Sequence, residues 1–366
     1  KLLMFKIPSQ ISNIFKNKKV LITGHTGFKG QWLSVFLKKM DANILGISLN
    51  TQTKPSHFKL LNLKIKNKYF DISDLKNLKK TINSYQPDFI FHLAAQALVK
   101  KSYINPYQTW SSNFNGTLNL LEVLRNYKKK VNVIMITSDK SYKNVEQKSG
   151  YKEDDVLAGI DPYSASKSAA DISITSYFLS FLKNKKNISV VVARAGNVIG
   201  GGDWSEDRLI PDCVKSWSKK KTAKIRNPNS TRPWQHVLEV TWGYIILGAF
   251  LKKKKKVLNG QAFNLGPNYE KNYKVKECLK IIKNYWPNIK WKISNSANKS
   301  YESKLLKLNS KKIRKLIGWS TVLSLKQTLK MTAEWYREFY ENKKIITEVQ
   351  LKNYINFFYK KNKIKL

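Results

Sequence analysis

The chain has 366 residues, of which 42% are hydrophobic and 12% aromatic, and it carries a formal net charge of +44. This composition excludes a disordered chain, and the length allows two domains or one large domain with an insertion. Such a charge suggests nucleic acid or another anionic partner, but the lysines are scattered and no nucleic-acid-binding motif accompanies them. We therefore expect an anionic small substrate and no nucleic-acid partner, with a basic nucleic-acid-binding protein as a distant alternative.

Cysteines, histidines and apolar runs exclude further classes. The two cysteines, Cys213 and Cys278, are far apart, which argues against a disulfide framework and fits a cytoplasmic location. The four histidines have no metal-ligand spacing, so we expect no metal site. The apolar run Leu2–Phe5 is too short for a signal peptide, and no stretch reaches membrane-spanning length, so no membrane insertion is expected. Lys1–Lys18 is expected to pack on the edge of the first domain.

The first expected strand leads into a glycine turn and a helix. Val20–Gly30 reads VLITGHTGFKG, and apolar residues on one helical face follow it. Gly24 can take backbone angles closed to other residues, Gly27 would let a pyrophosphate approach closely, and Gly30 would let the helix pack against the strand. The N-terminus of this helix would attract the anion. The pattern predicts a dinucleotide site, with a purely structural turn as the alternative.

The next two expected strands concern the adenosine half of such a site. Ala42–Leu49 is predicted to be a strand, and its end lacks the carboxylate that commonly binds the adenosine ribose, so charge does not distinguish NAD from NADP. Tyr69–Asp71 is predicted to be a short third strand, with Asp71 at a position where an acid often contacts adenine. The alternative for Asp71 is a helix N-cap, a role for which Asp74 competes.

Strands and helices are expected to alternate through the rest of the chain. The expected strands are Phe89–Ala95, Val133–Thr137, Ser189–Arg194 and Ala262–Leu265, and the expected helices are Thr109–Tyr127, Asp161–Leu182, Val275–Tyr285 and Ser324–Tyr340. This alternation predicts an α/β fold, a Rossmann-type doubly wound parallel sheet, with a smaller, mainly helical C-terminal substrate domain. The expected domains are 17–193 with about 236–266 for the cofactor, and 194–235 with 267–345 for the substrate, with terminal extensions 1–16 and 346–366.

Three polar residues suggest a proton relay. Tyr163 and Lys167 are four residues apart on one predicted helix and share a face, and Ser138 follows a strand at the end where open α/β sheets build their sites. The ammonium of Lys167 would lower the pKa of Tyr163. A tyrosinate could then take a proton from an alcohol while a hydride leaves the same carbon.

Eight segments carry a family resemblance: TGHTGFKG (Thr23–Gly30), HLAAQ (His92–Gln96), NxxGT (Asn113–Thr117), TSDKSY (Thr137–Tyr142), DPYSASK (Asp161–Lys167), ARAGNVIGGGDW (Ala193–Trp204), DRLIPD (Asp207–Asp212) and TRPWQHV (Thr231–Val237). With them the sequence resembles the extended short-chain dehydrogenase/reductase family, and within it the CDP-glucose 4,6-dehydratases. The resemblance runs from about Asn17 to about Glu341. The glycine turn and Tyr-x-x-x-Lys mark only the superfamily, whereas GGGDW, DRLIPD and TRPWQHV are more specific.

The resemblance implies a lyase that uses tightly bound NAD to convert CDP-glucose into CDP-4-keto-6-deoxyglucose, in deoxysugar formation for a surface polysaccharide such as O antigen. It implies that Tyr163 takes the sugar 4-OH proton and that Asp139 protonates the departing 6-OH. Lys140 would serve the C5 step, as a neutral base or as a cation that holds the enolate, with a solvent-facing lysine as the alternative. A homodimer or tetramer is implied, with the helices of Asn113 and Tyr163 paired across a two-fold axis.

The same resemblance assigns the remaining contacts. The cofactor residues would be Gly24, Thr26, Gly27, Phe28, Lys29, Gly30, Asp71, Ile72, Leu93, Ala94, Ala95, Asn113, Tyr163 and Lys167. The substrate residues would be Gln96, Asn197, Arg208, Arg232 and His236. An arginine fork suits a pyrophosphate, although Arg208 could form a surface ion pair and His236 could be a packed histidine. The alternative activity is a nucleotide-sugar epimerase, or a dehydratase of a UDP-, dTDP- or GDP-sugar.

Overall fold

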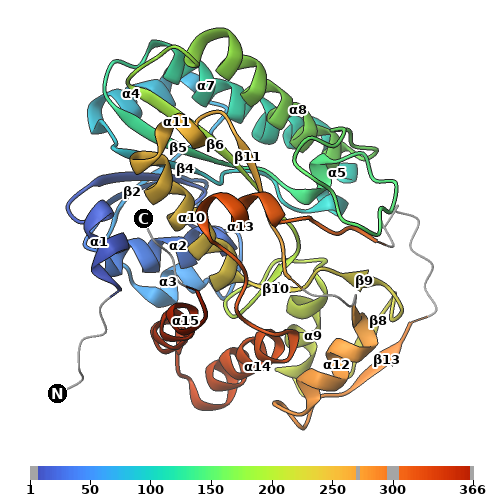
Figure 1. Ribbon diagram of the computed structural model, residues 1–366. Helices are drawn as coiled ribbons and strands as arrows, with labels where there is room; N and C mark the ends of the chain where they lie inside the picture. Colours follow the sequence, from blue (N-terminus) through green and yellow to red (C-terminus); the bar gives the residue numbers. More distant parts are fainter. Residues whose placement is uncertain (1–6, 269–272, 295–304, 363–366) are drawn as a thin grey trace, which may run out of the picture.

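The computed structural model describes residues 7–268, 273–294 and 305–362, and in this part of the chain the centre is a seven-stranded sheet (Figure 1). The strand order is β11-β6-β5-β4-β1-β2-β3, and all neighbours pair in parallel. The strands are β1 (Lys19–Thr23), β2 (Asn43–Ser48), β3 (Lys66–Tyr69), β4 (Phe89–His92), β5 (Val131–Ile136), β6 (Ile188–Ala195) and β11 (Ala262–Leu265). The predicted doubly wound α/β sheet is confirmed.

Helices cover both faces of the sheet. One face packs against α4 (Leu75–Tyr85), α7 (Gly116–Asn126) and α8 (Pro162–Tyr177), and the other against α1 (Ser9–Phe15), α2 (Phe28–Lys39) and α10 (Val237–Lys253). Successive β1 residues alternate between the two cores: Leu21 belongs to the first, and Val20 and Ile22 to the second. Because both faces are covered, β5 is buried along its whole length, as expected for a central parallel strand.

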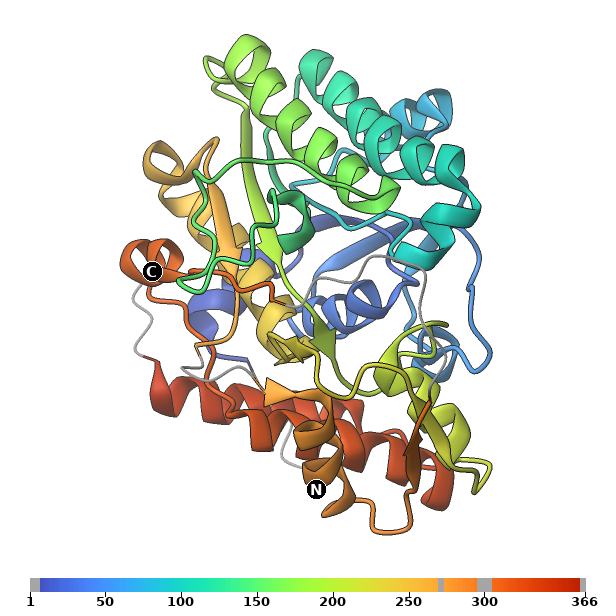
Figure 2. The ribbon, with the colours of Figure 1, turned by 90° about the vertical axis from the view of Figure 1, so that its right-hand side faces the viewer.

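The chain after β6 builds a smaller region. It holds α9 (Leu209–Trp217), α12 (Val275–Lys283), α14 (Leu325–Asn342), α15 (Thr347–Lys361) and three two-stranded sheets: β7 (Val198–Ile199) with β10 (Gln235–His236), β9 (Thr231–Arg232) with β12 (Tyr273–Lys274), and β8 (Ala223–Ile225) with β13 (Trp291–Ile293). Figure 2 shows α14 and α15, in red, on the opposite side of the molecule from α7 and α8. The boundaries of the two domains stay a prediction.

Short helices connect these parts. They are α3 (His57–Leu61), α5 (Val99–Ile104), α6 (Pro106–Trp110), α11 (Lys255–Leu258) and α13 (Lys311–Ile317), with a 3₁₀ turn η2 (Asp139–Ser141) and two π-helical turns, η1 (Ser111–Asn115) and η3 (Phe178–Leu182). The two π turns interrupt the long helices predicted for 109–127 and 161–182. A π turn is frequent at functional sites.

The bounds of several predicted strands shift in the structure, most clearly for the third and fourth. The third strand ends at Tyr69, where the predicted strand Tyr69–Asp71 begins, because the Asp71 carboxylate accepts hydrogen bonds from the backbone and hydroxyl of Ser73 and turns the chain. The fourth strand ends at His92 and not at Ala95. Beyond it the backbone turns to meet the side chain of Asn113.

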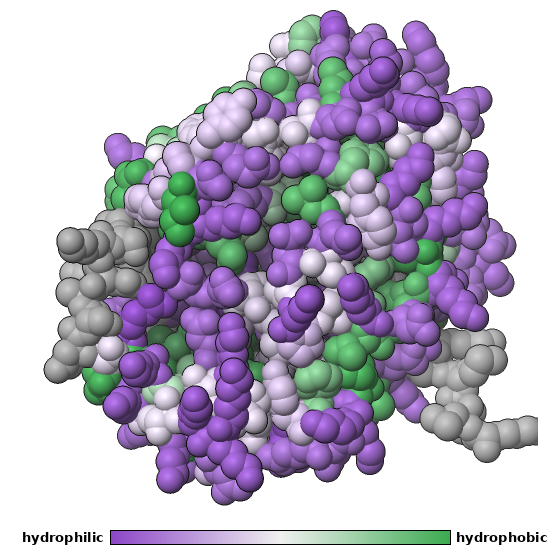
Figure 3. Space-filling model, turned by 180° about the vertical axis from the view of Figure 1, so that it is seen from behind, coloured by the Kyte–Doolittle hydropathy of each residue, from purple (hydrophilic) through white to green (hydrophobic). Residues whose placement is uncertain are grey.

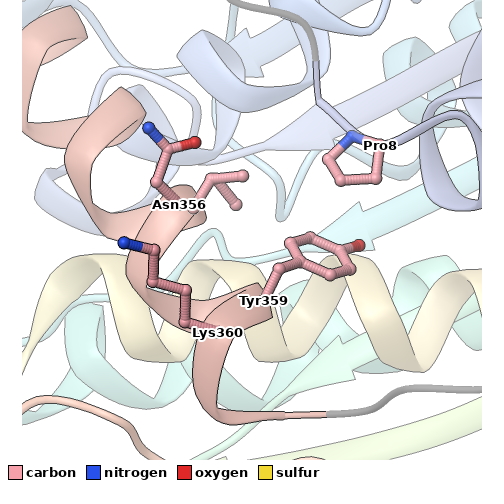
Figure 4. Close-up of a pocket in the computed structure, with 5 residues that line it drawn as sticks. Pro8, Asn356, Tyr359 and Lys360 are labelled. Atoms are coloured by element: carbon pink, nitrogen blue, oxygen red, sulfur yellow. The ribbon is translucent and has the colours of Figure 1, made fainter.

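The two ends of the described chain lie near one another. Residues 1–6 of the predicted leader lie outside the described residues, and Ser9–Phe15 forms α1, whose Phe15 ring is 4.7 Å from that of Phe89. An open pocket of about 370 Å³ separates Pro8 from Asn356, Tyr359 and Lys360 of α15 (Figure 4). It holds none of the predicted site residues.

The surface is dominated by polar side chains. Figure 3 shows hydrophilic residues over most of one face, with apolar residues in scattered groups. Of the helices in the described part of the chain, none combines the length and apolarity needed to cross a bilayer.

Candidate active site

The glycine turn between β1 and α2 leaves room only for backbone. Gly24 has a φ of +76°, and a Cβ there would lie 2.8 Å from the amide nitrogen of Ala94. A Cβ on Gly30 would overlap the carbonyl oxygen of Gly24. Gly27 is the N-cap of α2, and none of the described side chains bonds to the cap. The first amides of α2, including those of Phe28 and Lys29, can therefore bind an anion such as a pyrophosphate.

The ends of β2 and β3 bound the predicted adenosine end of the site. The Thr26 hydroxyl donates to Ser48 Oγ at 3.0 Å and to the Leu49 carbonyl at 3.3 Å, which ties the glycine turn to the end of β2. Asp74 accepts from the amide of Asn77 at 2.9 Å and is the N-cap of α4. The N-cap alternative for Asp71 is thereby settled in favour of Asp74.

Asp71 lies at the start of the loop after β3. Its Oδ2 accepts from Gln108 Nε2 at 3.3 Å, and the next residue, Ile72, is buried against Gly116. The half-buried Asp71 carboxylate is thus held at the edge of the sheet near α6, in a position that can face an adenosine.

Asn113 holds the segment that follows β4. Its Oδ1 accepts from the backbone N–H of Gln96 at 2.7 Å, and its Nδ2 donates to the Gln96 carbonyl at 3.1 Å and to Ser166 Oγ on α8 at 2.9 Å. The Gln96 side chain is also used locally, because its Nε2 donates to the Leu98 carbonyl and to Thr109 Oγ1. Both residues therefore shape the loop that carries the half-buried Leu93, Ala94 and Ala95.

The predicted proton-transfer groups meet at the carboxyl end of β5. Ser138 Oγ donates to Asp139 Oδ1 at 3.0 Å, and the Ser138 hydroxyl acts to lower the pKa of Tyr163. Burial raises the pKa of Asp139, although the charges of Lys140 and Lys29 and the Ser138 hydrogen bond act in the opposite direction. The site thus combines a phenol with a carboxyl group that is easier to protonate than an exposed aspartate.

The electrostatics around Tyr163 differ from the sequence-based prediction. Burial raises the pKa of Tyr163, and the groups that act to lower it are the Ser138 hydrogen bond and the Arg208 guanidinium. The expected effect of Lys167 is not among these causes. Its ammonium instead donates to the carbonyl of Ile136 at 3.3 Å, and burial lowers the pKa of Lys167 to about 8.

Two further lysines lie at the site. Burial lowers the pKa of Lys29 to about 8, with the charges of Arg208 and Lys167 in the same direction and that of Asp139 opposed. Lys29 therefore extends from the glycine turn toward the acid. Lys140 follows Asp139 in η2; it is half-buried, and its backbone N–H donates to Ser138 Oγ at 3.2 Å. The acid is thus flanked by cations from two different elements.

The predicted substrate residues take different positions. Arg208 donates to Asp203 Oδ2 and to the Ala97 carbonyl, each at 3.4 Å, so it joins the smaller region to the loop after β4. Asn197 is half-buried between β6 and β7. Arg232, on β9, donates to the carbonyl of Thr231 at 2.7 Å.

His236 is fully buried, and its Nδ1 accepts from the N–H of Leu238 at 3.2 Å. This side chain caps α10, which is compatible with the packed-histidine alternative, and its role as a substrate residue stays a prediction. Within the residues that the structure describes, no cluster of three or more His, Cys, Asp or Glu side chains could hold a metal ion.

The sequence analysis did not assign a role to Asp171 and Arg194, which form a buried ion pair close to the predicted catalytic residues. The signal was present, because 163, 167 and 171 recur at intervals of four on one helix and therefore share a face.

Comparisons with known proteins bear on the chemistry of this site. Residues 21–332 match the sequence model of the family described as GDP-mannose 4,6 dehydratase. The chain is 37% identical to the CDP-glucose 4,6-dehydratase of Salmonella typhimurium over 331 residues, which cover 89% of this chain and 92% of that relative.

Two solved structures share the fold. An epimerase from Methanothermobacter thermautotrophicus superposes with a TM-score of 0.80 at 22% identity, covering 93% of this chain and 97% of that one. The dTDP-glucose 4,6-dehydratase of Bacillus anthracis, solved in complex with NAD, gives a TM-score of 0.71 at 20% identity, covering 88% and 97%. Because an epimerase and a dehydratase share this fold, the side chains of the site must decide between the two reactions.

Proposed function

The chain belongs to the GDP-mannose 4,6 dehydratase family, and on that premise we propose that it is a nucleotide-sugar dehydratase that converts CDP-glucose into CDP-4-keto-6-deoxyglucose. The cytidine nucleotide is proposed from the 37% identity to the Salmonella typhimurium enzyme, together with the GGGDW, DRLIPD and TRPWQHV segments.

The position of Asp139 is the observation that favours a dehydratase over an epimerase. Loss of a hydroxyl group as water needs an acid, and an epimerase that only removes and returns a hydride does not. Asp139 is a buried carboxyl with a raised pKa; it accepts a hydrogen bond from Ser138 and lies close enough to Tyr163 for its charge to raise the pKa of the phenol. An acid is thus available next to the phenol that would take the proton of the sugar 4-OH.

The residues can then act in sequence. Tyr163, as phenolate, takes the 4-OH proton of the sugar; Ser138 and Arg208 favour its negative charge against the larger opposing effect of burial. The ketone formed at C4 makes the C5 proton acidic, and Lys140 removes it or holds the resulting enolate. Asp139 donates its proton to the departing 6-OH, which leaves as water.

NAD is proposed as the cofactor, and when bound it accepts the hydride from C4 and supplies it again to C6. The residues fit it: Gly24 and Gly30 leave no space for side chains at the turn, and the uncapped amides at the N-terminus of α2 would bind the pyrophosphate. Thr26, Phe28, Asp71 and Ile72 would surround its adenosine half, Lys29 would reach from the glycine turn toward the reacting end, and the backbone of Leu93, Ala94 and Ala95 would lie along its length.

We also propose a homodimer formed through α6, α7 and α8. Tyr107 on α6 is 83% exposed and Ile172 on α8 is 51% exposed, and such apolar side chains on neighbouring helices suit a second copy of the same surface. A cytoplasmic location fits the two unpaired, buried cysteines. The product would enter deoxysugar formation for a surface polysaccharide.

The test is to incubate the purified protein with CDP-, UDP-, dTDP- and GDP-glucose and to assay each for a 4-keto-6-deoxy product. We expect ketone from CDP-glucose and little from the other three. Ketone from another nucleotide sugar alone would keep the reaction and overturn the substrate, whereas an epimerised sugar without loss of water would overturn the dehydratase.

A further inference from the structure

Two side chains of helix α8 form hydrogen bonds with Ile136 and Thr137, two neighbouring residues at the end of β5. Asp171 Oδ2 accepts a hydrogen bond from Thr137 Oγ1 at 2.8 Å, and Lys167 Nζ donates to the carbonyl of Ile136 at 3.3 Å. Thr137 directly precedes Ser138, and Asp171 lies one turn beyond Lys167. Both contacts are therefore adjacent to the residues proposed to carry the reaction.

The carboxylate of Asp171 is held by hydrogen bonds to both of its oxygens. Arg194 on β6 binds both of its oxygens, with Nε to Oδ2 and Nη2 to Oδ1, each at 2.8 Å. The side chains are 4% and 0% exposed. Arg194 is itself held, since its Nη1 donates to the Tyr142 hydroxyl at 2.8 Å and to the Glu153 carbonyl at 2.7 Å. A bidentate pair of this kind fixes direction as well as distance.

We propose that Asp171, held by Arg194, is a positioning residue that fixes Tyr163 and Lys167 relative to Ser138 and Asp139. Tyr163, Lys167 and Asp171 lie on one face of α8, whereas Ser138 and Asp139 follow β5, so the two halves of the site come from different elements. The hydrogen bond from Thr137 to Asp171 joins side chains of these elements directly. The inference rests on the proposed function, because it concerns the same reacting groups.

The same carboxylate acts on the charge of Lys167. Asp171 raises the pKa of Lys167 against the larger lowering by burial. The other groups that face this ammonium are Lys29 from α2, which is cationic, and His92 from β4, whose pKa burial lowers to about 3, so that it is neutral. Asp171 is therefore the anion that favours the charged form of Lys167. Its removal makes the ammonium lose its proton at a lower pH.

The first test separates position from folding. Thr137→Val deletes the hydrogen bond to Asp171 and keeps the side-chain volume, whereas Thr137→Ser keeps a hydroxyl that can form this bond. The control, Thr175→Val, makes the same change one turn beyond Asp171 on α8, where the hydroxyl bonds only within the helix. We expect Thr137→Val to lower kcat roughly tenfold, as a displaced reacting group does, with KM for CDP-glucose nearly unchanged. Thr137→Ser should recover most of the loss, and Thr175→Val should match the unmodified chain. Equal kcat for the two valine variants overturns the inference.

The second test needs no substrate. The pH dependence of Lys167 acetylation, followed by peptide mass spectrometry, measures where its ammonium loses a proton in the unmodified chain and in Asp171→Asn. We expect a lower midpoint in the variant, and an unchanged midpoint in a folded variant overturns the inference. If the unmodified chain does not dehydrate CDP-glucose, the proposed function fails alone, because this titration still decides whether Asp171 sets the charge of Lys167.

Discussion

Asp139 lies against the backbone of Gly196, so closely that a Cβ at position 196 would be 2.9 Å from Oδ2 of the carboxylate. Gly196 directly follows β6, and Asp139 begins the turn after β5. The neighbouring strands thus bring the proposed acid and a residue without a side chain together. This contact gives Gly196 a role in the site that its motif alone does not reveal.

Gly196→Ala is expected to lower kcat by roughly tenfold or more, because the added methyl group must displace the Asp139 carboxylate from its reacting position. Steady-state kinetics with CDP-glucose and a thermal unfolding curve are the measurements. The unfolding temperature should change little, since Gly196 has an ordinary backbone conformation and is absent from the positive-φ glycines of the described chain. Undiminished kcat would show that the carboxylate does not need this position.

Asp139→Asn is expected to slow dehydration by a factor of roughly 10² to 10⁴, the usual contribution of a general acid. The first step depends on Tyr163 and should survive, so a single turnover with CDP-glucose should still produce the absorbance of reduced nicotinamide. Loss of both signals in a folded variant would assign Asp139 to the oxidation step and not to the departure of the 6-OH.

Lys140→Ala tests the C5 step. The matched control is Lys143→Ala, because Lys143 is a nearby exposed lysine. We expect Lys140→Ala to slow turnover and to slow uptake of solvent deuterium at C5, because no other group has been assigned to that proton. Lys143→Ala should behave like the unmodified chain. Equal turnover in the two alanine variants would remove Lys140 from the mechanism.

The buried carboxyl of Glu239 should make the free energy of unfolding depend on pH. It is buried on α10 and accepts hydrogen bonds from the amides of Val322 and Leu323 and from the Tyr354 hydroxyl. Burial raises its pKa from 4.5 to about 7. A raised folded-state pKa means that its contribution is fully present below about pH 4.5 and is lost as the pH rises through about 7.

Glu239→Gln keeps the shape and removes this titration. Between about pH 4.5 and 7 the unmodified chain should therefore lose on the order of a few kcal/mol of unfolding free energy relative to the variant. Urea unfolding at several pH values measures the difference. Parallel pH profiles for the two proteins would mean that the carboxyl is accommodated as an anion.

Secondary structure could be predicted from the sequence where burial produces a recognisable pattern of apolar residues. The central strands β1, β4, β5 and β6 are covered on both faces, so they appear as continuous apolar runs, and the glycine turn is marked by residues that no side chain can replace. By contrast, α10 was not predicted. All but two of its residues, Lys252 and Lys253, are buried, so it has no polar face and no helical period to detect.

By itself, the sequence determined the parallel α/β architecture, the glycine turn and the set of candidate catalytic residues, because these depend on local patterns and on spacing along one element. Only the tertiary structure decided which groups act on Tyr163, which acid caps α4, and that Asp171 joins α8 to β5. Those outcomes depend on burial and on contacts between residues far apart in the chain: the ion pair of Asp171 and Arg194, for example, joins a helix to a strand that follows it. A periodic pattern can place each residue on a face, but only the packed fold brings the faces together.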